Sequence, residues 1–374
     1  MTKDLHKIVS GEVYIVDLPV TEVHSHGSGD VKTIRSVLLE LTTDSGLTGW
    51  GEASPWAVFT GTVESNAAAL KNYFIPAIIG RSPFDVEVIL DQMDRMVVHA
   101  SEAKAALEMA LLDLTGKALD TRVCDLLGGA HREKSLMSFS IANPDFDQDF
   151  AKVQRMVEDG VRIFKFKTGF KDHAFDLMRV EKIRSEFGDL LDLRIDYNQG
   201  MKAQEALPKL KDFESFGLSF IEQPVPRDNL EAMKHFTHVL TTPVMADESV
   251  FNPREALVGA QMRVADIFSL KVMKSGGIRK ALQVAAIARA AGIGVYGGCM
   301  FETGIAHAAG AHLMACAPEL ELSCEFYMAN YYLREDILEE TFPVKNGYVH
   351  VPEGKGLGVN VDRSKLEHYG QRFQ

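Results

Sequence analysis

The spacing of hydrophobic positions divides the chain into two patterns. Near the N-terminus, some segments alternate apolar and polar residues like half-buried strands, and others carry apolar residues at helical spacing. The alternating segments are residues 13–20, 37–43 and 47–52, with an Asp44-Ser-Gly turn, and the helical ones are residues 64–80, 84–97 and 101–119. A sheet followed by helices predicts an α+β domain over residues 1–130, which ends at the Gly128-Gly129 breaker.

From about residue 135, short apolar runs alternate with amphipathic helical segments. The candidate strands are residues 135–142, 162–168, 192–198, 218–223, 243–248, 266–272, 293–298 and 320–325. Eight strands about 25–30 residues apart are typical of a (β/α)8 TIM-like barrel, which we assign to residues 131–345. The alternative is an open doubly wound sheet, but no Gly-x-Gly-x-x-Gly fingerprint follows any of these strands.

The last segment, residues 346–374, contains a strand-like Tyr348-Val-His-Val and a glycine-rich turn, and we expect it to pack back on the first domain. The predicted fold class is α/β, a (β/α)8 TIM-like barrel with an N-terminal α+β capping domain completed by the C-terminal segment. The length of 374 residues suits one barrel of about 250 residues with a smaller partner.

Composition excludes several classes of function. A formal net charge of −12 argues against a phosphate-binding surface, so nucleic acid is not an expected partner. The four cysteines form no Cys-x-x-Cys pair and fit a reducing cytoplasm. The N-terminus lacks an apolar targeting segment, and the apolar run 284–296 is interrupted by Arg289 and too short for a bilayer. We expect a cytoplasmic homo-oligomer without a membrane partner.

Charged residues interrupt the barrel strands at positions that should face the lumen. In Ile163-Phe-Lys-Phe-Lys, the two phenylalanines should face the helices, so Lys165 and Lys167 should point inward. The same alternation places Asp196 and Asn198 inside in the next strand, and Lys271 inside in the sixth. These residues lie at the C-terminal strand ends, where barrel active sites are built.

Carboxylates end three consecutive strands, because Glu222 and the pair Asp247 and Glu248 follow Asp196 along the chain. Buried lone charges are costly, so this set requires either ion pairing or a metal. A salt-bridge network in the barrel mouth is the plainer interpretation. Five strands that carry such groups favour a hard divalent cation with oxygen ligands, and Mg²⁺ is the natural candidate.

A metal beside inward-facing lysines indicates chemistry on the carbon next to a carboxylate. The α-proton is too weakly acidic for an amine unless the resulting enediolate is stabilised, which a bound metal can do as a Lewis acid. We assign Lys167 as the base, with its pKa depressed by Lys165 and by the metal ion. Lys271 should face the opposite side of the substrate carbon.

These residues resemble the enolase superfamily, in particular the mandelate racemase/muconate lactonizing enzyme family and its muconate lactonizing subgroup. The motifs that carry the resemblance are Lys165-Phe-Lys167, Asp196-Tyr-Asn198, Glu222-Gln-Pro, Asp247-Glu-Ser, Lys271-Val-Met-Lys-Ser-Gly-Gly and Gly49-Trp-Gly-Glu52-Ala. The resemblance implies that Asp196, Glu222 and Asp247 bind Mg²⁺, with Mn²⁺ able to replace it. It also implies that Lys167 and Lys271 flank the substrate carbon and that Lys165 belongs to the catalytic set. The resemblance further implies supporting roles for Asn198, Glu248 and Glu325.

The subgroup contains several reactions that share these residues. Our first hypothesis is muconate cycloisomerase-type activity, from muconate to muconolactone. The alternative is a racemase, epimerase or dehydratase of an N-substituted amino acid or proline derivative, such as a hydroxyproline dehydratase or a proline betaine racemase. A dipeptide epimerase is disfavoured because Ser323-Cys-Glu325 stands where such enzymes carry Asp-x-Asp. A non-catalytic barrel that binds a ligand is disfavoured because no metal ligand or lysine is missing.

Specificity for the small carboxylic acid should lie in two cap segments, the loop at residues 21–32 and the segment at residues 55–61. His24, His26, Lys32 and Arg35 could contact a second carboxylate, or could be ordinary solvated charges. Asp30, Trp56 and Phe59 could instead hold a cationic amine, although packing between cap and barrel explains Trp56 equally well. Cys299, after the seventh strand, is a further candidate near the substrate.

Overall fold

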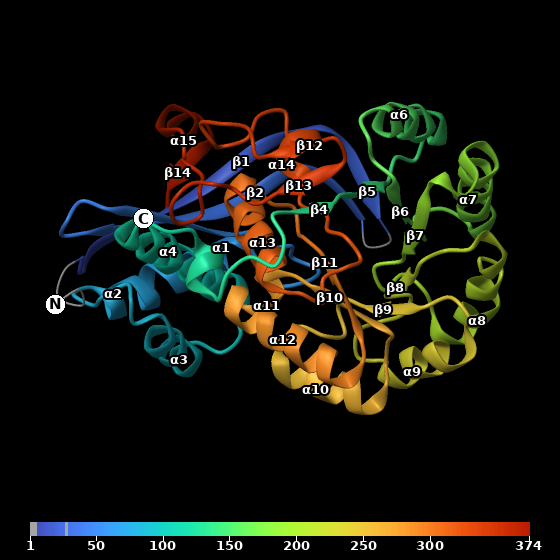
Figure 1. Cartoon of the computed structure of the whole chain (residues 1–374), viewed down its shortest axis with the longest axis horizontal. Helices are drawn as coiled ribbons and strands as arrows, with labels where there is room; N and C mark the ends of the chain where they lie inside the picture. Colours follow the sequence, from blue (N-terminus) through green and yellow to red (C-terminus); the bar gives the residue numbers. More distant parts are fainter. Residues whose placement is uncertain (1–5, 27–28) are drawn as a thin grey trace.

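The computed structural model describes residues 6–26 and 29–374. It contains an antiparallel cap and a curled parallel sheet surrounded by helices (Figure 1). Within the described residues, no helix is both long enough and apolar enough to cross a membrane.

The cap is built on an antiparallel sheet with the strand order β14-β1-β2-β3. Its strands are β1 (Ile8–His26), β2 (Gly29–Thr43), β3 (Thr48–Ala53) and β14 (Gly370–Arg372). Its helices are α1 (Val63–Ala69), α2 (Ile75–Ile78), α3 (Val86–Met96), α4 (Ser101–Leu119), α5 (Val123–Leu126) and α15 (Arg363–Tyr369). The alternating and helical patterns at the N-terminus predicted β1 to β3 and α1 to α4, apart from a π-helical turn at Leu70–Phe74. They did not predict α5, β14 or α15.

The described residues on both sides of positions 27–28 belong to the antiparallel β1–β2 hairpin, so they do not form the irregular loop that we expected at residues 21–32. The backbone of β1 pairs with β2 as far as His26 and Gly29, after an irregularity between Pro19 and His24. The hairpin bends toward the barrel, where Thr21 N donates to the carbonyl of Tyr332 over 2.9 Å (Figure 1). Glycines made this segment look irregular in the sequence, because its residues lack the apolar–polar alternation by which a half-buried strand is recognised, although their backbone groups pair.

The barrel strands form a parallel sheet with the order β11-β10-β9-β8-β7-β6-β5 in the described chain. They are β5 (Ser138–Ile141), β6 (Ile163–Lys167), β7 (Asp192–Asp196), β8 (Ile221–Glu222), β9 (Val244–Ala246), β10 (Ile267–Leu270) and β11 (Gly294–Gly297). Cys324 closes the ring, because it forms parallel bridges to both Met137 and Gly297. The eighth predicted strand is thus reduced to one bridging position, and the fold is a TIM-like barrel with a capping domain.

Helices follow the barrel strands in the order expected for repeated β-α units. They are α6 (Phe146–Glu158), α7 (His173–Phe187), α8 (Ala203–Lys211), α9 (Leu230–Val239), α10 (Pro253–Met262), α11 (Val272–Ser275), α12 (Ile278–Ala291), α13 (Gly304–Cys316) and α14 (Met328–Tyr331).

The C-terminal segment divides between the two parts of the molecule. Strand β14 pairs with β1 and so completes the cap sheet. By contrast, β13 (Tyr348–His350) pairs with β12 (Val344–Lys345) and with β4 (Lys134–Leu136), just ahead of the first barrel strand. The domain boundaries at residues 130 and 345 remain a proposal.

Close backbone contact holds the cap together, and buried carboxylates join it to the barrel. Strand β3 packs directly against α4, since a Cβ at Gly49 or Gly51 would collide with a carbonyl oxygen of that helix. Glu52, at the end of the same motif, accepts hydrogen bonds from the backbone N–H groups of Thr303 and Ala306 at the start of α13. Glu108 of α4 accepts from Ile278 N at the start of α12. Carboxylates at helix N-termini are favourable electrostatically.

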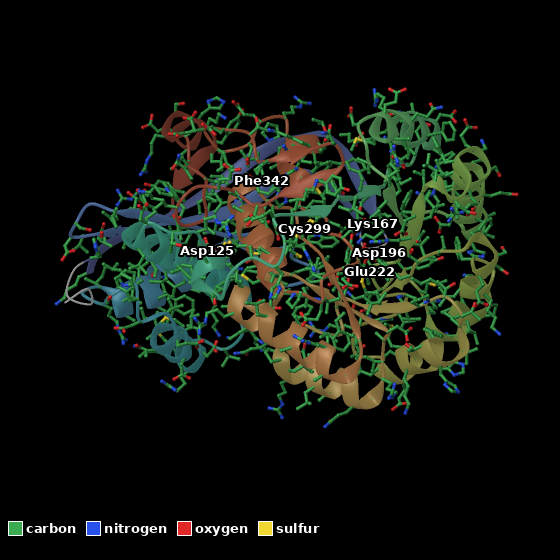
Figure 2. The ribbon with its side chains drawn as sticks, in the orientation of Figure 1. Asp125, Lys167, Asp196, Glu222, Cys299 and Phe342 are labelled. Carbon is green, nitrogen blue, oxygen red and sulfur yellow. The ribbon has the colours of Figure 1, made fainter. Side chains whose placement is uncertain are left out.

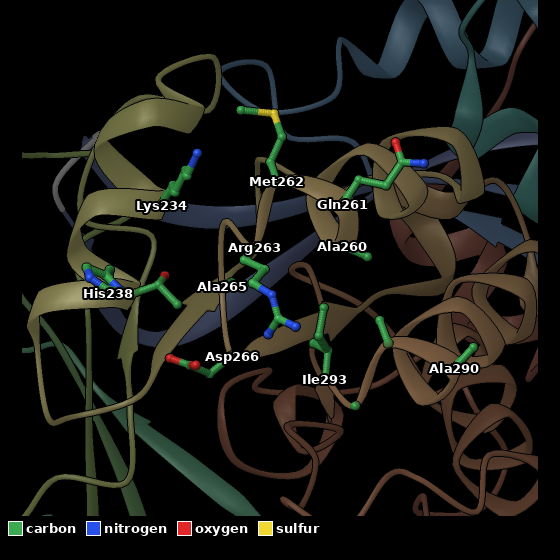
Figure 3. A pocket seen from close by; sticks show the side chains of 13 residues that line it. Lys234, His238, Ala260, Gln261, Met262, Arg263, Ala265, Asp266, Ala290 and Ile293 are labelled. Atoms are coloured by element: carbon green, nitrogen blue, oxygen red, sulfur yellow. The ribbon is translucent and has the colours of Figure 1, made fainter.

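A cavity of about 820 Å³ is lined by Lys234, Arg263, Asp266 and other residues (Figure 3). It lies at the end of the barrel opposite to the charged strand ends. Asp266 directly precedes β10, and Ile293 directly precedes β11. The cavity therefore opens at the N-terminal strand ends, a face associated with stability rather than catalysis in this fold.

The contact between β3 and α4 predicts a large effect for a small substitution. Gly51→Ala should lower the free energy of unfolding by about 3 kcal/mol, because the new methyl group meets the fixed carbonyl of Ala106. Urea denaturation measures the change. Gly294→Ala is the matched control, since its nearest neighbours lie 3.5 Å from the added Cβ. Equal stability of the two variants would contradict this account of the cap.

Candidate active site

Strand register brings the charged side chains of the barrel mouth into one layer. Lys167 pairs with Asp196 between β6 and β7, and Asp196 pairs with Glu222 between β7 and β8. Asp196 and Glu222 are 0% and 1% exposed, and Figure 2 shows them close to Lys167. The predicted inward orientation of Lys165 is confirmed, because its side chain is 1% exposed and its Nζ contacts lumen carboxylates.

Two lysines from β6 contact the buried carboxylates, and both reach Asp196, from which Lys165 Nζ lies 3.6 Å away. Lys167 Nζ donates to Asp196 Oδ2 over 2.6 Å and to Asn198 Oδ1 over 3.0 Å. Lys165 Nζ lies 2.6 Å from Glu222 Oε2 and 2.9 Å from Glu325 Oε1. Burial opposes the charged form of Lys165, but Glu222 and Glu325 outweigh it and raise the pKa of Lys165 well above its usual value.

Asp247 is held by two further lysines. Its Oδ2 lies 2.6 Å from Lys271 Nζ, directly after β10, and its Oδ1 lies 2.8 Å from Lys274 Nζ on the next helical turn. Burial alone would raise the pKa of Asp247, but the charges of Lys271 and Lys274 outweigh it, so this pKa lies well below the usual range. Lys271 was predicted from strand alternation, whereas Lys274 was not assigned a role.

The negative charges in this layer repel one another. Burial and then the neighbouring charge of Asp196 raise the pKa of Glu222 well above its usual value. Burial and the charge of Asp247 also raise the pKa of Glu248 to about 8. Glu248 Oε2 is buried without a hydrogen-bond partner in the described part of the chain. Carboxylates on adjacent strands that repel one another, with an unsatisfied oxygen of Glu248 beside them, fit a hard divalent cation better than lysines alone.

Backbone strain and an amide side chain support this layer. Asn198 and Gln223 have φ angles of 42° and 33°, a region that residues other than glycine seldom adopt and that tends to occur at functional sites. The Asn198 backbone N–H donates to Asp196 Oδ1 over 2.8 Å. Gln223 Oε1 accepts from the backbone N–H groups of Asp247 and Ser249, at 3.0 and 3.1 Å, and so orients the Asp247 segment.

Sequence reasoning missed Gln223 and Lys274 as supports of the site. Gln223 follows Glu222 directly and should by simple alternation face away from the lumen. Lys274 lies three residues after Lys271, and this spacing brings it back to Asp247 only because residues 272–275 form a helical turn. That spacing was the available signal for Lys274, and no local pattern indicates Gln223.

The other predicted supporting residues lie around the same layer. Asn198 Nδ2 donates to Glu248 Oε1 over 3.4 Å. Glu325 accepts from Ser140 Oγ over 2.9 Å in addition to its contact with Lys165. Cys299 Sγ donates to the backbone carbonyl of Glu325 over 3.2 Å.

Aromatic side chains of the cap cover one side of the lysine layer. Lys271 Nζ lies 4.7 Å from the ring centroid of Phe59. Phe59 stacks on Phe251, with centroids 5.2 Å apart, and Trp56 contacts Phe301 edge-on at 5.7 Å. Trp56 therefore packs between cap and barrel, as the plainer interpretation held. A cavity of about 500 Å³ is bordered by Phe59, Phe251 and Lys274.

The cap cations predicted to meet a second carboxylate are only partly described. Arg35 lies 2.9 Å from Asp17 and 3.0 Å from Glu64, so its charge is already paired. Lys32 is exposed. The side chains of His24, His26 and Asp30 lie outside the described residues.

The buried ion pairs of Lys165 predict a test of stability. In metal-free protein, Lys165→Met should lower the free energy of unfolding by about 3–5 kcal/mol, because Glu222 loses its 2.6 Å partner. The double variant Lys165→Met/Glu222→Gln should recover part of the loss. Denaturant unfolding measures both changes. If Lys165→Met were as stable as the unsubstituted protein, the ion pairs of Glu222 and Glu325 with Lys165 would contribute nothing to the stability of the fold.

Two family models match most of the chain. The model for the mandelate racemase / muconate lactonizing enzyme N-terminal domain matches residues 10–128, and the enolase C-terminal domain-like model matches residues 149–365.

Individual relatives cover nearly the full length. A chloromuconate cycloisomerase from Cupriavidus necator is 34% identical over 97% of this chain and 99% of its own. The L-Ala-D/L-Glu epimerase of Bacillus subtilis is 33% identical over 94% of this chain and 96% of its own. A crystal structure of a muconate cycloisomerase from Azorhizobium caulinodans is 42% identical with a TM-score of 0.87, covering 98% and 99% of the two chains. This chain belongs to the mandelate racemase/muconate lactonizing enzyme family of the enolase superfamily, and within it to the muconate lactonizing subgroup.

Proposed function

We propose that this protein is a Mg²⁺-dependent enzyme that moves a proton on the carbon next to a substrate carboxylate, with muconate cycloisomerase-type activity. The observation that carries the proposal is the buried layer in which carboxylates of three adjacent strands meet lysines from both sides. Such a layer is costly without a role, because each charge must be desolvated. The family is generally metal-dependent, and relatives of this chain include cycloisomerases.

Asp196, Glu222 and Asp247 would hold the cation through carboxylate oxygens, which Mg²⁺ prefers. When bound, the ion supplies Lewis-acid stabilisation to the enediolate oxygens. Mutual repulsion among these buried carboxylates and the unpartnered Glu248 Oε2 support a cation at this place. Mn²⁺ has similar ligand preferences and should replace Mg²⁺.

Lys167 and Lys271 would act on the substrate carbon from opposite sides. They end the second and sixth barrel strands, which are four positions apart around an eight-position ring. Lys167 is the less buried of the two, with 15% of its side chain exposed. Lys165, at 1% exposure, is a positioning residue that holds Glu222 and Glu325 in place.

The cycloisomerase reaction requires one proton transfer at the carbon. A carboxylate oxygen adds across a double bond, and a lysine N–H delivers a proton to the carbon next to the other carboxylate. The second lysine then stabilises the developing negative charge without transferring a proton. The names of the relatives from Cupriavidus necator and Azorhizobium caulinodans support muconate or a related diacid as the substrate class.

The second candidate is a racemase, epimerase or dehydratase of an amino-acid derivative. Two observations favour it. Arg35 is already paired with Asp17 and Glu64, so its charge is engaged rather than available to a second carboxylate of a diacid. The ring of Phe59 lies beside Lys271 and stacks with Trp56, with ring centroids 6.1 Å apart. Aromatic faces attract cationic nitrogens. A dipeptide substrate remains disfavoured, because Glu325 is engaged with Lys165 and Ser140.

The cytoplasmic location and the homo-oligomer remain proposals. The four cysteines all lie in the described part of the chain and are unpaired thiols, which suits a reducing compartment. Sedimentation of the purified protein measures the oligomeric state.

The metal assignment predicts the effect of removing each ligand. Asp196→Asn, Glu222→Gln and Asp247→Asn should each raise the Mg²⁺ dissociation constant more than about 100-fold, since even outer partners of metal ligands contribute 10–100-fold. Titration calorimetry measures binding, and activity should fall in parallel. Asp192→Asn, at the other end of β7, is the control and should bind Mg²⁺ normally. Normal Mg²⁺ binding by all three ligand variants would refute the assignment.

The lysine assignment predicts which protons exchange in D₂O. With muconolactone, replacing the proton-transferring lysine by Ala should slow α-deuterium incorporation by about 10²–10⁴-fold, while the other variant retains exchange. With an N-substituted amino acid as a true substrate, both Lys167→Ala and Lys271→Ala should lose racemisation. Mass spectrometry reads the incorporated deuterium. Lys171→Ala, on the exposed turn after β6, is the control. Full turnover in both active-site variants would exclude these lysines as acid and base.

A further inference from the structure

A second group of potential metal ligands lies where β11 gives way to α13. Cys299, Glu302 and His307 each offer one ligand atom, and these three atoms all lie within 4.8 Å of one another. The side chains are 8%, 3% and 0% exposed. Figure 2 labels Cys299 and places it apart from the group of Lys167, Asp196 and Glu222.

His307 is the side chain that the fold leaves unsatisfied. Neither of its ring nitrogens has a hydrogen-bond partner among the described residues. Its ring lies among Phe326 and Phe342, with centroids 6.1 and 5.5 Å away, so packing alone would be served by an apolar residue. Its Nε2 faces Glu302 Oε2 at 3.9 Å, which is too long for a hydrogen bond.

Glu302 and Cys299 each offer one ligand atom to this space. Glu302 Oε1 accepts from the backbone N–H of Met300 over 2.9 Å, while Oε2 is the atom that faces His307. Cys299 Sγ donates its thiol proton to the backbone carbonyl of Glu325 over 3.2 Å. On binding a cation the thiol would release this proton, so the hydrogen bond would be exchanged for a bond from the thiolate to the metal.

We propose that Cys299, Glu302 and His307 bind one thiophilic divalent cation of the Zn²⁺ class, separate from the Mg²⁺ site. A thiolate, a carboxylate and a neutral imidazole are the usual ligands of such ions, and their two negative charges balance the cation in an apolar surrounding. Bond lengths of about 2.0–2.3 Å require the ligand atoms to lie about 3.3–3.8 Å apart, so the side chains must close by about 1 Å.

The two sites should select different ions. Mg²⁺ favours oxygen ligands and would remain with Asp196, Glu222 and Asp247, whereas sulfur and imidazole favour Zn²⁺ or Co²⁺. The cation would enter beside Cys299, the most exposed of the three side chains. A bound cation would also stabilise the turn at the start of α13, whose backbone N–H groups at Thr303 and Ala306 donate to Glu52 of the cap. Occupancy should therefore raise the thermal midpoint.

Co²⁺ is the probe, because a cobalt–thiolate bond gives a charge-transfer band in the near ultraviolet. Micromolar Co²⁺ added to Mg²⁺-saturated enzyme should produce this band with one Co²⁺ per chain. Cys299→Ser should abolish the band, and His307→Leu should raise the Co²⁺ dissociation constant more than about 100-fold. The leucine suits the apolar surroundings of His307, and retained Mg²⁺ binding verifies that each variant is folded.

Two controls separate this site from the rest of the protein. Cys324→Ser removes another buried thiol, whose Sγ faces Leu136 O and Met314 Sδ, and should leave the band unchanged. Asp196→Asn impairs the proposed Mg²⁺ site and should also leave it unchanged, so failure of one proposal does not imply failure of the other. The proposal is overturned if the unsubstituted enzyme gives no thiolate band, or if the band survives both Cys299→Ser and His307→Leu.

Discussion

The repulsion among carboxylates buried in the barrel mouth constrains the rest of the structure. Asp196, Glu222 and Asp247 are at most 1% exposed, so water cannot screen them, and charges of opposite sign must lie close by. Lysines from β6 and from the turn after β10 supply part of that charge. This requirement explains why cationic residues occupy lumen positions that are usually apolar in a barrel.

The cap is also held by buried carboxylates, which here bind the N-termini of helices instead of lysines. Glu52 and Glu108 bind the first turns of α13 and α12, so the cap uses helix N-termini as its anchors on the barrel. Because α13 follows the strand that ends near Cys299, the position of the cap and the shape of the active-site rim are coupled. Glu102 extends this coupling, since it accepts a hydrogen bond from Thr60 in the segment that carries Phe59.

Much of this architecture was predictable from the sequence, and the misses share a physical cause. Alternation in Phe164-Lys-Phe-Lys located Lys165 and Lys167 correctly, because strand period is a local property. The end of the β1–β2 hairpin was expected to be a loop, since its glycine-rich composition gives no strand pattern although the two strands pair there. Lys274 and Gln223 contribute through a helical turn and an amide network, whose geometry exists only after folding. The eighth barrel strand was predicted over residues 320–325, but only Cys324 forms bridges to the neighbouring strands. The length of that pairing is also set only after folding.

Diffraction from crystals grown with Mn²⁺ would test the central claim most directly, because the anomalous signal locates the ion without reference to activity. The account predicts one strong peak bounded by oxygens of Asp196, Glu222 and Asp247, at Mn–O distances close to the 2.0–2.1 Å typical of Mg²⁺. Lys167 and Lys271 should then face a shared space beside it. A Mn²⁺ peak elsewhere, with the three carboxylates still bound only to lysines, would contradict the account.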